Sequence, residues 1–195
     1  MEREVMATGI GGQGIQLAAD VLARAATAEG REVLMFGSYG GMMRGGNTDA
    51  SLVIGDEPIS APPVPEWAWA ALVMHHEHAR PVLAKLRPNG VAFVNTSVVE
   101  GVLDTGTAAR VELAATDIAV EVGNIICASL VMLGALAKET GLVTLAALDS
   151  AVVEALPPYR RQHVGLNQAA LRAGFDAVRG AGHPAWSAAT SGAAR

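Results

Sequence analysis

The chain has 195 residues, of which 51% are hydrophobic and 17% charged, and its formal net charge is −5. That length suits one α/β domain with a sizeable core. The acidic balance and the absence of a long basic run argue against nucleic-acid binding, and no apolar run reaches the roughly 18 residues that a membrane-spanning helix needs.

The first part of the chain predicts a strand–turn–helix–strand unit. A short strand over residues 3–8 runs into a glycine-rich turn over 9–14, and the helix over 15–29 has apolar residues at helical spacing. A second strand follows over 32–36. A second glycine-rich loop and a strand over 50–54 complete this part.

The rest of the chain continues the alternation of strands and helices. Strands are expected over 70–74, 91–95 and 108–114, and helices over 76–86, 124–139, 145–155 and 164–179. Asp117 is expected to cap a helix, and residues 88–90, Pro-Asn-Gly, to form a turn. This order predicts an α/β fold: a Rossmann-like, doubly wound, largely parallel sheet in a single domain over residues 1–180, with a mobile tail over 181–195.

The first glycine loop fits a site for an anionic ligand. Gly9, Gly11 and Gly14 have the G-x-G-x-x-G spacing between a strand and a helix, so a phosphate could approach the helix N-terminus. A tight turn with no ligand is the alternative. A dinucleotide site usually has a carboxylate at the end of the second strand, and residues 34–38 contain none. NAD binding is therefore disfavoured.

The second glycine loop contains one cation, Arg44, between Met43 and two glycines. Its planar guanidinium suits a phosphate or carboxylate, and it suits equally well a role in pinning the loop through backbone carbonyls. Both loops follow strands, and the carboxyl ends of parallel strands form the usual ligand edge of such sheets. We therefore expect the two loops to meet there.

An ordered set of motifs carries a family resemblance. It comprises Gly9-Ile10-Gly11-Gly12-Gln13-Gly14, Tyr39-Gly40-Gly41-Met42-Met43-Arg44-Gly45-Gly46, Pro58-Ile59-Ser60-Ala61-Pro62, Asn124 with Leu133-Gly134-Ala135, and Asn167 with Ala170 and Gly174. Over residues 3–178 the chain resembles the gamma subunit of 2-oxoacid:ferredoxin (acceptor) oxidoreductases. That group acts on pyruvate, 2-oxoglutarate, indolepyruvate or phenylglyoxylate.

The resemblance implies a non-redox subunit of a larger enzyme, inactive when isolated. The complex would use thiamine diphosphate, Mg, iron–sulfur clusters and coenzyme A to convert a 2-oxoacid to acyl-CoA and CO2. Its partners would be alpha, beta and delta subunits, with ferredoxin or a flavin/NAD subunit as acceptor. The cofactor-binding residues it implies in this chain are Gly9, Gly11, Gly12, Gln13, Gly14, Tyr39, Arg44, Gly45 and Gly46.

The second loop departs from the family pattern. Gly41 and Met42 stand where pyruvate- and 2-oxoglutarate-type members have Pro and Glu. This departure favours an aryl 2-oxoacid such as phenylglyoxylate or indolepyruvate. A stand-alone NAD(P)-dependent dehydrogenase and a non-catalytic structural module remain the alternative functions.

Other residues have weaker interpretations. Cys127 is the only cysteine, so this chain alone cannot hold an iron–sulfur cluster, and it is expected to be inert core. His75 and His78 invite a metal interpretation, but a polar helix start is favoured. Trp67 and Trp69 favour a subunit interface. The N-terminus lacks a secretory apolar segment, so a cytoplasmic location is expected.

Overall fold

The structure, a computed structural model, describes residues 1–39, 46–62, 64–180 and 182–186. The strands are β1 (Glu2–Ile10), β2 (Glu32–Tyr39), β3 (Asn47–Gly55), β4 (Ala68–Val73), β5 (Leu86–Asn95) and β6 (Ala109–Leu113). The α-helices are α1 (Ile15–Ala28), α2 (Ala79–Leu83), α3 (Ala115–Val122), α4 (Ala128–Thr140), α5 (Leu145–Ala155) and α6 (Val164–Asp176). Short 3-10 helices are η1 (His76–His78), η2 (Ile125–Cys127) and η3 (Pro158–His163).

The strands form one sheet in the order β2-β3-β1-β4-β5-β6. The pairs β1–β4, β4–β5 and β5–β6 are parallel, whereas β3 is antiparallel to both β1 and β2. All strands except β3 therefore run in one direction, which confirms the predicted largely parallel α/β sheet. The antiparallel direction of β3 was not predicted.

The position of β3 changes the meaning of the missing carboxylate. In the usual dinucleotide fold the second strand lies beside the first. Here β3 lies between β1 and β2 along its whole length, from the pair Glu2–Gly55 to the pair Ile10–Asn47. The end of β2 is thus one strand further from the glycine turn than in that fold. A side chain at that end is therefore not placed to bind the ribose hydroxyls of a dinucleotide at the turn.

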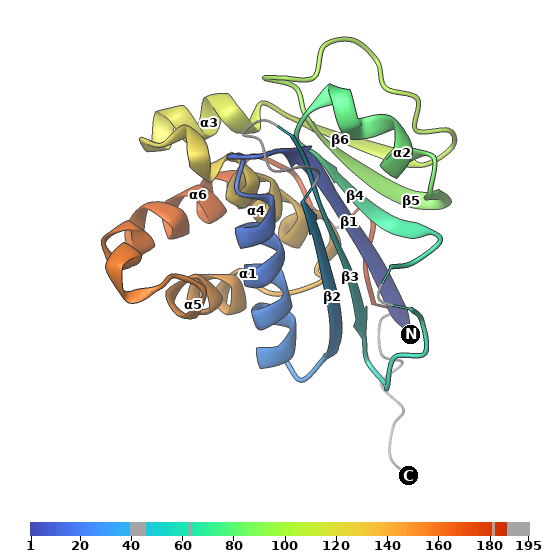
Figure 1. The fold of residues 1–195 in the computed structure, drawn as a ribbon, viewed down its shortest axis with the longest axis horizontal. Helices are drawn as coiled ribbons and strands as arrows, with labels where there is room; N and C mark the ends of the chain where they lie inside the picture. Colours follow the sequence, from blue (N-terminus) through green and yellow to red (C-terminus); the bar gives the residue numbers. More distant parts are fainter. Residues whose placement is uncertain (40–45, 63, 181, 187–195) are drawn as a thin grey trace.

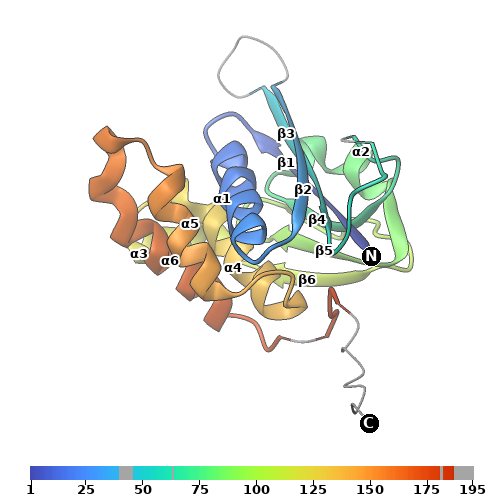
Figure 2. The ribbon, with the colours of Figure 1, turned by 90° about the horizontal axis from the view of Figure 1, so that it is seen from below.

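Helices cover both faces of the sheet, but unequally (Figures 1 and 2). Helices α1, α3, α4, α5 and α6 lie on one face, and α2 lies on the other. The larger apolar core fills the first interface, with Leu22, Leu52, Phe93 and Leu133 each at most 2% exposed. The smaller core, under α2, includes Val82 and reaches β1, β4 and β5. Among the described residues, no helix lies over the part of that face formed by β2 and β3 (Figures 1 and 2).

Helix α4 is the centre of the helical layer, because nearly all of its residues are buried. It packs closely on α6 through two glycines. A Cβ atom on Gly134 would lie 2.0 Å from the carbonyl oxygen of Leu171, and one on Gly174 would lie 1.8 Å from that of Val131. Only hydrogen atoms fit at these two positions, so the glycines set the distance between the helices.

Several predicted element boundaries need correction. The helix expected over 124–139 starts as η2, and Asn124 caps it by accepting a hydrogen bond from the N–H of Ile126 at 3.0 Å. Asp117 is not a cap, since it lies in the first turn of α3 and its N–H donates to Ser97 Oγ at 3.1 Å. The predicted turn at 88–90 lies within β5, where the pairing with β4 shifts register. The helix expected over 76–86 is only η1 and the short α2.

The start of the predicted mobile tail is bound to the domain. The N–H of Ala185 donates to the carbonyl of Thr140 at 2.7 Å, and Trp186 Nε1 donates to the carbonyl of Leu142 at 3.1 Å. The Arg31 guanidinium lies 4.0 Å from the centroid of a Trp186 ring. Residues 182–186 therefore belong to the fold, and residues 187–195 lie outside the described part of the chain.

Two further observations bear on the expected surfaces. Trp69 is 4% exposed and belongs to the core, so its predicted interface role is wrong, whereas Trp67 is half-exposed. Within the described ranges, no helix has the length and apolar character needed to cross a membrane.

Candidate functional site

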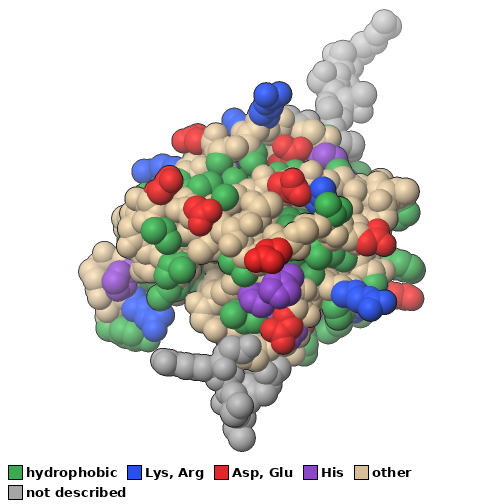
Figure 3. Space-filling model, turned by 90° about the horizontal axis from the view of Figure 1, so that it is seen from above, with side chains coloured by type: hydrophobic (Ala, Val, Ile, Leu, Met, Phe, Trp, Pro, Cys, Tyr) green, Lys and Arg blue, Asp and Glu red, His purple; other side chains and the backbone are tan. Residues whose placement is uncertain are grey.

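The two glycine loops meet at the carboxyl edge of the parallel strands, which we call the rim. The N–H of Gly11, after β1, donates to the carbonyl of Gly46, before β3, at 2.9 Å. Figure 3 looks down on this side of the molecule and shows lysine and arginine side chains scattered over it instead of gathered. The predicted meeting of the loops is confirmed at this contact. Residues 40–45, which include Arg44 and Gly45, and the side chain of Tyr39 lie outside the described structure.

Gln13 ties the first loop to the neighbouring strand. Its Oε1 accepts from the N–H of Ile10 at 2.9 Å, and its Nε2 donates to the carbonyl of Met74, just after β4, at 3.1 Å. Both ends of the amide are thus engaged within the protein. The side chain of Gln13 positions the loop, and among the described residues of the first loop the donors left for a ligand are backbone N–H groups.

The N-terminus of α1 has no side-chain cap. Gly14, its N-cap, has a φ of 76° in the left-handed region, no side chain caps the helix, and its first turn contains no acidic residue. Gly12 also has a positive φ, 104°. The first backbone N–H groups of an uncapped helix point outward with the positive end of the helix dipole. This arrangement suits a phosphate or carboxylate group.

Ser129, at the start of α4, lies directly behind Gly14. A Cβ atom on Gly14 would be 2.7 Å from Ser129 Oγ and 3.2 Å from the carbonyl oxygen of Ile126. Ser129 is 2% exposed, and its hydroxyl has no hydrogen-bond partner. Gly14 is therefore required both for its backbone conformation and for the close approach of α4.

A polar group at the start of β3 was missed by the sequence analysis. Asn47 Nδ2 donates to Asp49 Oδ2 at 2.7 Å, and Gln16 Nε2 donates to the carbonyl of Asp49 at 2.8 Å. The Oδ1 atoms of both Asn47 and Asp49 are buried without a partner. These acceptors lie on the α2 face of the sheet, opposite the face that α1 covers. The signal in the sequence was the pair Asn47 and Asp49, two residues apart on one strand. The search for glycine motifs did not consider this pair.

The histidine cluster has a structural role at the end of β4. His75 Nδ1 accepts from the N–H of Glu77 at 3.3 Å and caps η1, and the ring stacks on His76 with centroids 4.5 Å apart. Burial and the neighbouring His76 lower the pKa of His75, so the neutral ring is favoured. Among the described residues, no three metal-binding side chains come together.

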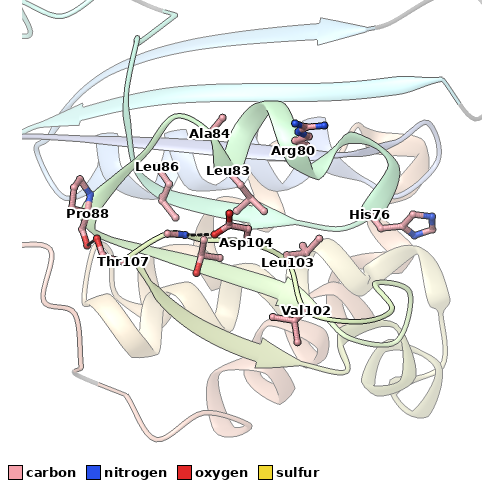
Figure 4. Close-up of a pocket in the computed structure, with 12 residues that line it drawn as sticks. His76, Arg80, Leu83, Ala84, Leu86, Pro88, Val102, Leu103, Asp104 and Thr107 are labelled. Carbon is pink, nitrogen blue, oxygen red and sulfur yellow. Dashed lines mark hydrogen bonds between the residues drawn. The ribbon is translucent and has the colours of Figure 1, made fainter.

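A separate cavity of about 800 Å3 lies between α2 and the loop that follows β5 (Figure 4). It is lined by both apolar and polar residues, among them Leu83, Leu86 and Asp104. Asp104 Oδ1 accepts from the N–H of Gly106 at 2.9 Å, the contact drawn dashed in Figure 4, so this carboxylate holds its own loop. None of the predicted site residues lines this cavity.

Removal of the Gln13 side chain should loosen the rim. Gln13→Ala loses two hydrogen bonds and leaves the N–H of Ile10 and the carbonyl of Met74 without their partner, so the free energy of unfolding should fall by about 2 kcal/mol. Gln162→Ala is a matched control, since Gln162 is exposed on η3. Urea unfolding followed by circular dichroism measures both. Equal stabilities of the two variants would contradict the positioning role.

Comparisons with known proteins identify the family of the chain. The family described as "Pyruvate ferredoxin/flavodoxin oxidoreductase" matches residues 4–177. The 2-oxoglutarate synthase subunit KorC of Methanothermobacter marburgensis is 33% identical over 165 residues, covering 81% of this chain and 88% of that protein. The pyruvate/ketoisovalerate oxidoreductases common subunit gamma of Thermococcus kodakarensis is 35% identical over 159 residues, covering 77% and 85%.

Solved structures show the same fold. The keto/oxoacid ferredoxin oxidoreductase gamma subunit of Geobacter sulfurreducens superposes with a TM-score of 0.76 at 30% identity, covering 89% of this chain and 96% of that one. The 2-oxoglutarate:ferredoxin oxidoreductase of Magnetococcus marinus superposes with a TM-score of 0.79 at 16% identity over 31% of its length, which shows the fold alone. The chain therefore belongs to the pyruvate ferredoxin/flavodoxin oxidoreductase family, as the gamma subunit of a 2-oxoacid:ferredoxin oxidoreductase.

Proposed function

We propose that this subunit forms the coenzyme A side of a thiamine diphosphate-dependent oxidoreductase, which decarboxylates a 2-oxoacid oxidatively to acyl-CoA and CO2. The observation that carries the proposal is the uncapped N-terminus of α1 beside the contact between Gly11 and Gly46. Coenzyme A presents phosphate groups, and backbone N–H groups at a helix N-terminus bind phosphates well. The cofactor-binding residues proposed are those of the rim: Gly9, Gly11, Gly12, Gln13, Gly14, Tyr39, Arg44, Gly45 and Gly46.

In this proposal the residues of the chain bind and orient, and the cofactors supply the electron chemistry. The α1 terminus and Arg44 hold an anionic group, while Gln13 fixes the loop through β4. Thiamine diphosphate, which other subunits of the complex would hold, would supply the electron sink for decarboxylation. Its Mg ion and the iron–sulfur clusters are assigned to other subunits.

The chemistry of Cys127 supports that assignment for the clusters. Its thiol is 3% exposed and donates to Asn167 Oδ1 at 3.1 Å. Burial raises the pKa of this thiol, so the thiolate that a cluster requires is disfavoured. Partner alpha, beta and delta subunits would supply the ligands, and ferredoxin or a flavin/NAD subunit would accept the electrons. A buried free thiol also fits the cytoplasm, which we propose as the location.

The proposed substrate is an aryl 2-oxoacid such as phenylglyoxylate or indolepyruvate. Gly41 and Met42 in the second loop support it, because they depart from the Pro and Glu of the pyruvate and 2-oxoglutarate pattern. The purified complex should be assayed on a panel of aliphatic and aryl 2-oxoacids. A higher kcat/KM for pyruvate or 2-oxoglutarate than for the aryl acids would refute this choice of substrate alone.

Arg44→Ala in the assembled complex tests the coenzyme A site. A charge-assisted hydrogen bond contributes about 1.5–3 kcal/mol, so the KM for coenzyme A should rise about tenfold or more. The KM for the 2-oxoacid should stay within about twofold. Arg110→Ala is the control, because Arg110 lies on β6 at the opposite edge of the sheet. Unchanged coenzyme A affinity and turnover would remove Arg44 from the site.

The isolated chain separates the alternative functions. The proposal expects no oxidoreductase turnover from the purified subunit and activity after assembly with a thiamine-binding partner. Turnover of NAD(P) by the chain alone would instead establish a dehydrogenase, against which the insertion of β3 argues. Failure of every thiamine-binding partner to assemble with it would leave only a structural module.

A further inference from the structure

Ser129, at the start of α4, carries a buried hydroxyl without a hydrogen-bond partner among the described residues. The residue is 2% exposed, and its Oγ neither donates to nor accepts from a protein group there. A buried hydroxyl in this state destabilises the fold, because it has lost its hydrogen bonds to water. Such groups are rare in folded proteins, so the retention of this one indicates a role other than packing.

The hydroxyl of Ser129 does not use the partner that its own helix offers. Serine and threonine in helices often donate to the carbonyl oxygen four residues earlier. Thr27, Thr140 and Ser150 do so in this chain, at 2.9, 2.6 and 3.1 Å. Ser129 makes no such bond, and its Oγ lies instead 2.7 Å from the point where a Cβ atom on Gly14 would stand. The hydroxyl is therefore directed at the first glycine loop.

The residue that Ser129 faces is the N-cap of α1. Helix α1 has 14 residues, and the Gly14 N-cap provides no side-chain oxygen for its first N–H groups. The positive end of a helix of this length favours an anion. The uncapped helix terminus and the unpartnered hydroxyl are independent observations, and both point to an anion bound in front of Gly14.

The backbone of the loop in front of Ser129 can rotate at low cost. Gly12 and Gly14, on either side of Gln13, have φ angles of 104° and 76°. Glycine adopts positive and negative φ about equally readily, so the peptide group that joins Gln13 to Gly14 is free to turn. The side chain of Gln13 meanwhile keeps the loop attached to the ends of β1 and β4.

A bound anion decides which way this peptide group turns. Anions attract backbone N–H groups and repel carbonyl oxygens. In a planar trans peptide the N–H and the C=O point in opposite directions. When the N–H of Gly14 faces an anion at the rim, the carbonyl oxygen of Gln13 therefore faces the interior. Ser129 Oγ lies on that side of the loop, so the anion gives the hydroxyl an acceptor.

We propose that Ser129 is a positioning residue of the anion site at the N-terminus of α1. Its hydroxyl donates to the carbonyl oxygen of Gln13 when a phosphate group is bound, and it thereby holds the loop with its N–H groups toward the ligand. Ser129 itself does not touch the phosphate. Because the hydroxyl has no partner in the subunit without ligand, the bond gained on binding adds to the affinity. This inference rests on the proposed function, in which coenzyme A supplies the phosphate.

Ser129→Ala in the assembled complex tests this role by titration calorimetry with coenzyme A. Loss of one neutral hydrogen bond that forms on binding should raise the dissociation constant about fivefold. Ser150→Ala is the matched control, because its hydroxyl is exposed on α5 and bonded within that helix, and it should bind coenzyme A as the wild type does. Equal affinities of Ser129→Ala and the wild type would refute this inference alone. A wild-type complex that does not bind coenzyme A would refute the proposed function.

Two further measurements separate this role from a purely structural one. Since the hydroxyl bonds nothing in the free subunit, the isolated Ser129→Ala chain should unfold at the same urea concentration as the wild type or at a higher one. A lower midpoint would show that the hydroxyl already has a partner without ligand, which contradicts the inference. Ser129→Cys keeps the shape of the side chain but donates weakly, so it should weaken coenzyme A binding as Ser129→Ala does. Binding by Ser129→Cys as tight as that of the wild type would assign the effect to packing and overturn the inference.

Discussion

Gly174→Ala should lower the free energy of unfolding by about 3 kcal/mol, among the largest effects of a single methyl group in this chain. The added Cβ would lie 1.8 Å from the carbonyl oxygen of Val131 and 2.6 Å from its carbon. These are backbone atoms of α4, which no rotamer change can move aside. The helices must separate, and the contact at Gly134 would be lost with them.

The control for Gly174→Ala is the same substitution on the same helix. Gly165, near the start of α6, is exposed, and a Cβ there would meet nothing within 4 Å. Because alanine favours helix over glycine, Gly165→Ala should raise the stability by about 0.5 kcal/mol. Equilibrium urea unfolding of the two variants should thus give changes of opposite sign. A loss below about 1 kcal/mol for Gly174→Ala would contradict the close packing of α4 on α6.

Arg87→Met should cost about 2 kcal/mol of stability by leaving a buried carboxylate without its partner. Glu4 on β1 is 4% exposed, and Arg87 Nη2 donates to its Oε1 at 2.5 Å. Removal of one partner of a fully buried ion pair usually lowers the stability by more than this. The expected loss is smaller here, because the Arg87 side chain is 43% exposed and Arg3 remains as a second positive charge near Glu4.

A double variant separates the pair from the packing of Arg87. Glu4→Gln combined with Arg87→Met removes both charges, and its stability should lie within about 1 kcal/mol of the wild type. Thermal and urea unfolding at one ionic strength measure the four proteins of this cycle. If the double variant were as unstable as Arg87→Met alone, the arginine would be acting through its packing and not through its charge.

The sequence predicted those helices and strands that have a regular apolar spacing and end at glycine or proline residues. Helix α5 was predicted with its observed bounds, because Pro157 stops an apolar pattern that begins after Thr144. The direction of β3 was not predictable from its residues, since parallel and antiparallel strands share the same apolar pattern. The register shift within β5 was hidden for another reason: Pro-Asn-Gly is the usual signature of a turn.

The rim was predicted in outline but not in its details. Glycine spacing located the first loop, and the contact between Gly11 and Gly46 confirmed that the two loops meet. The role of Gln13 depends on the carbonyl of Met74, which lies 61 residues away in the chain. The acceptors of Asn47 and Asp49 likewise depend on the neighbouring strand and helix. Contacts between residues so far apart in the sequence produce no local sequence pattern from which they could be predicted.

The antiparallel course of β3 has a consequence for how this subunit type diversifies. Strands β2 and β3 form a hairpin, paired up to Tyr39 and Thr48, so the intervening sequence begins and ends at one place on the sheet. Exchanging residues such as Gly41 and Met42 there leaves every buried side chain of the two strands in register. The sequence between Tyr39 and Thr48 can therefore change from one family member to another while the pairing of β2 with β3 is kept.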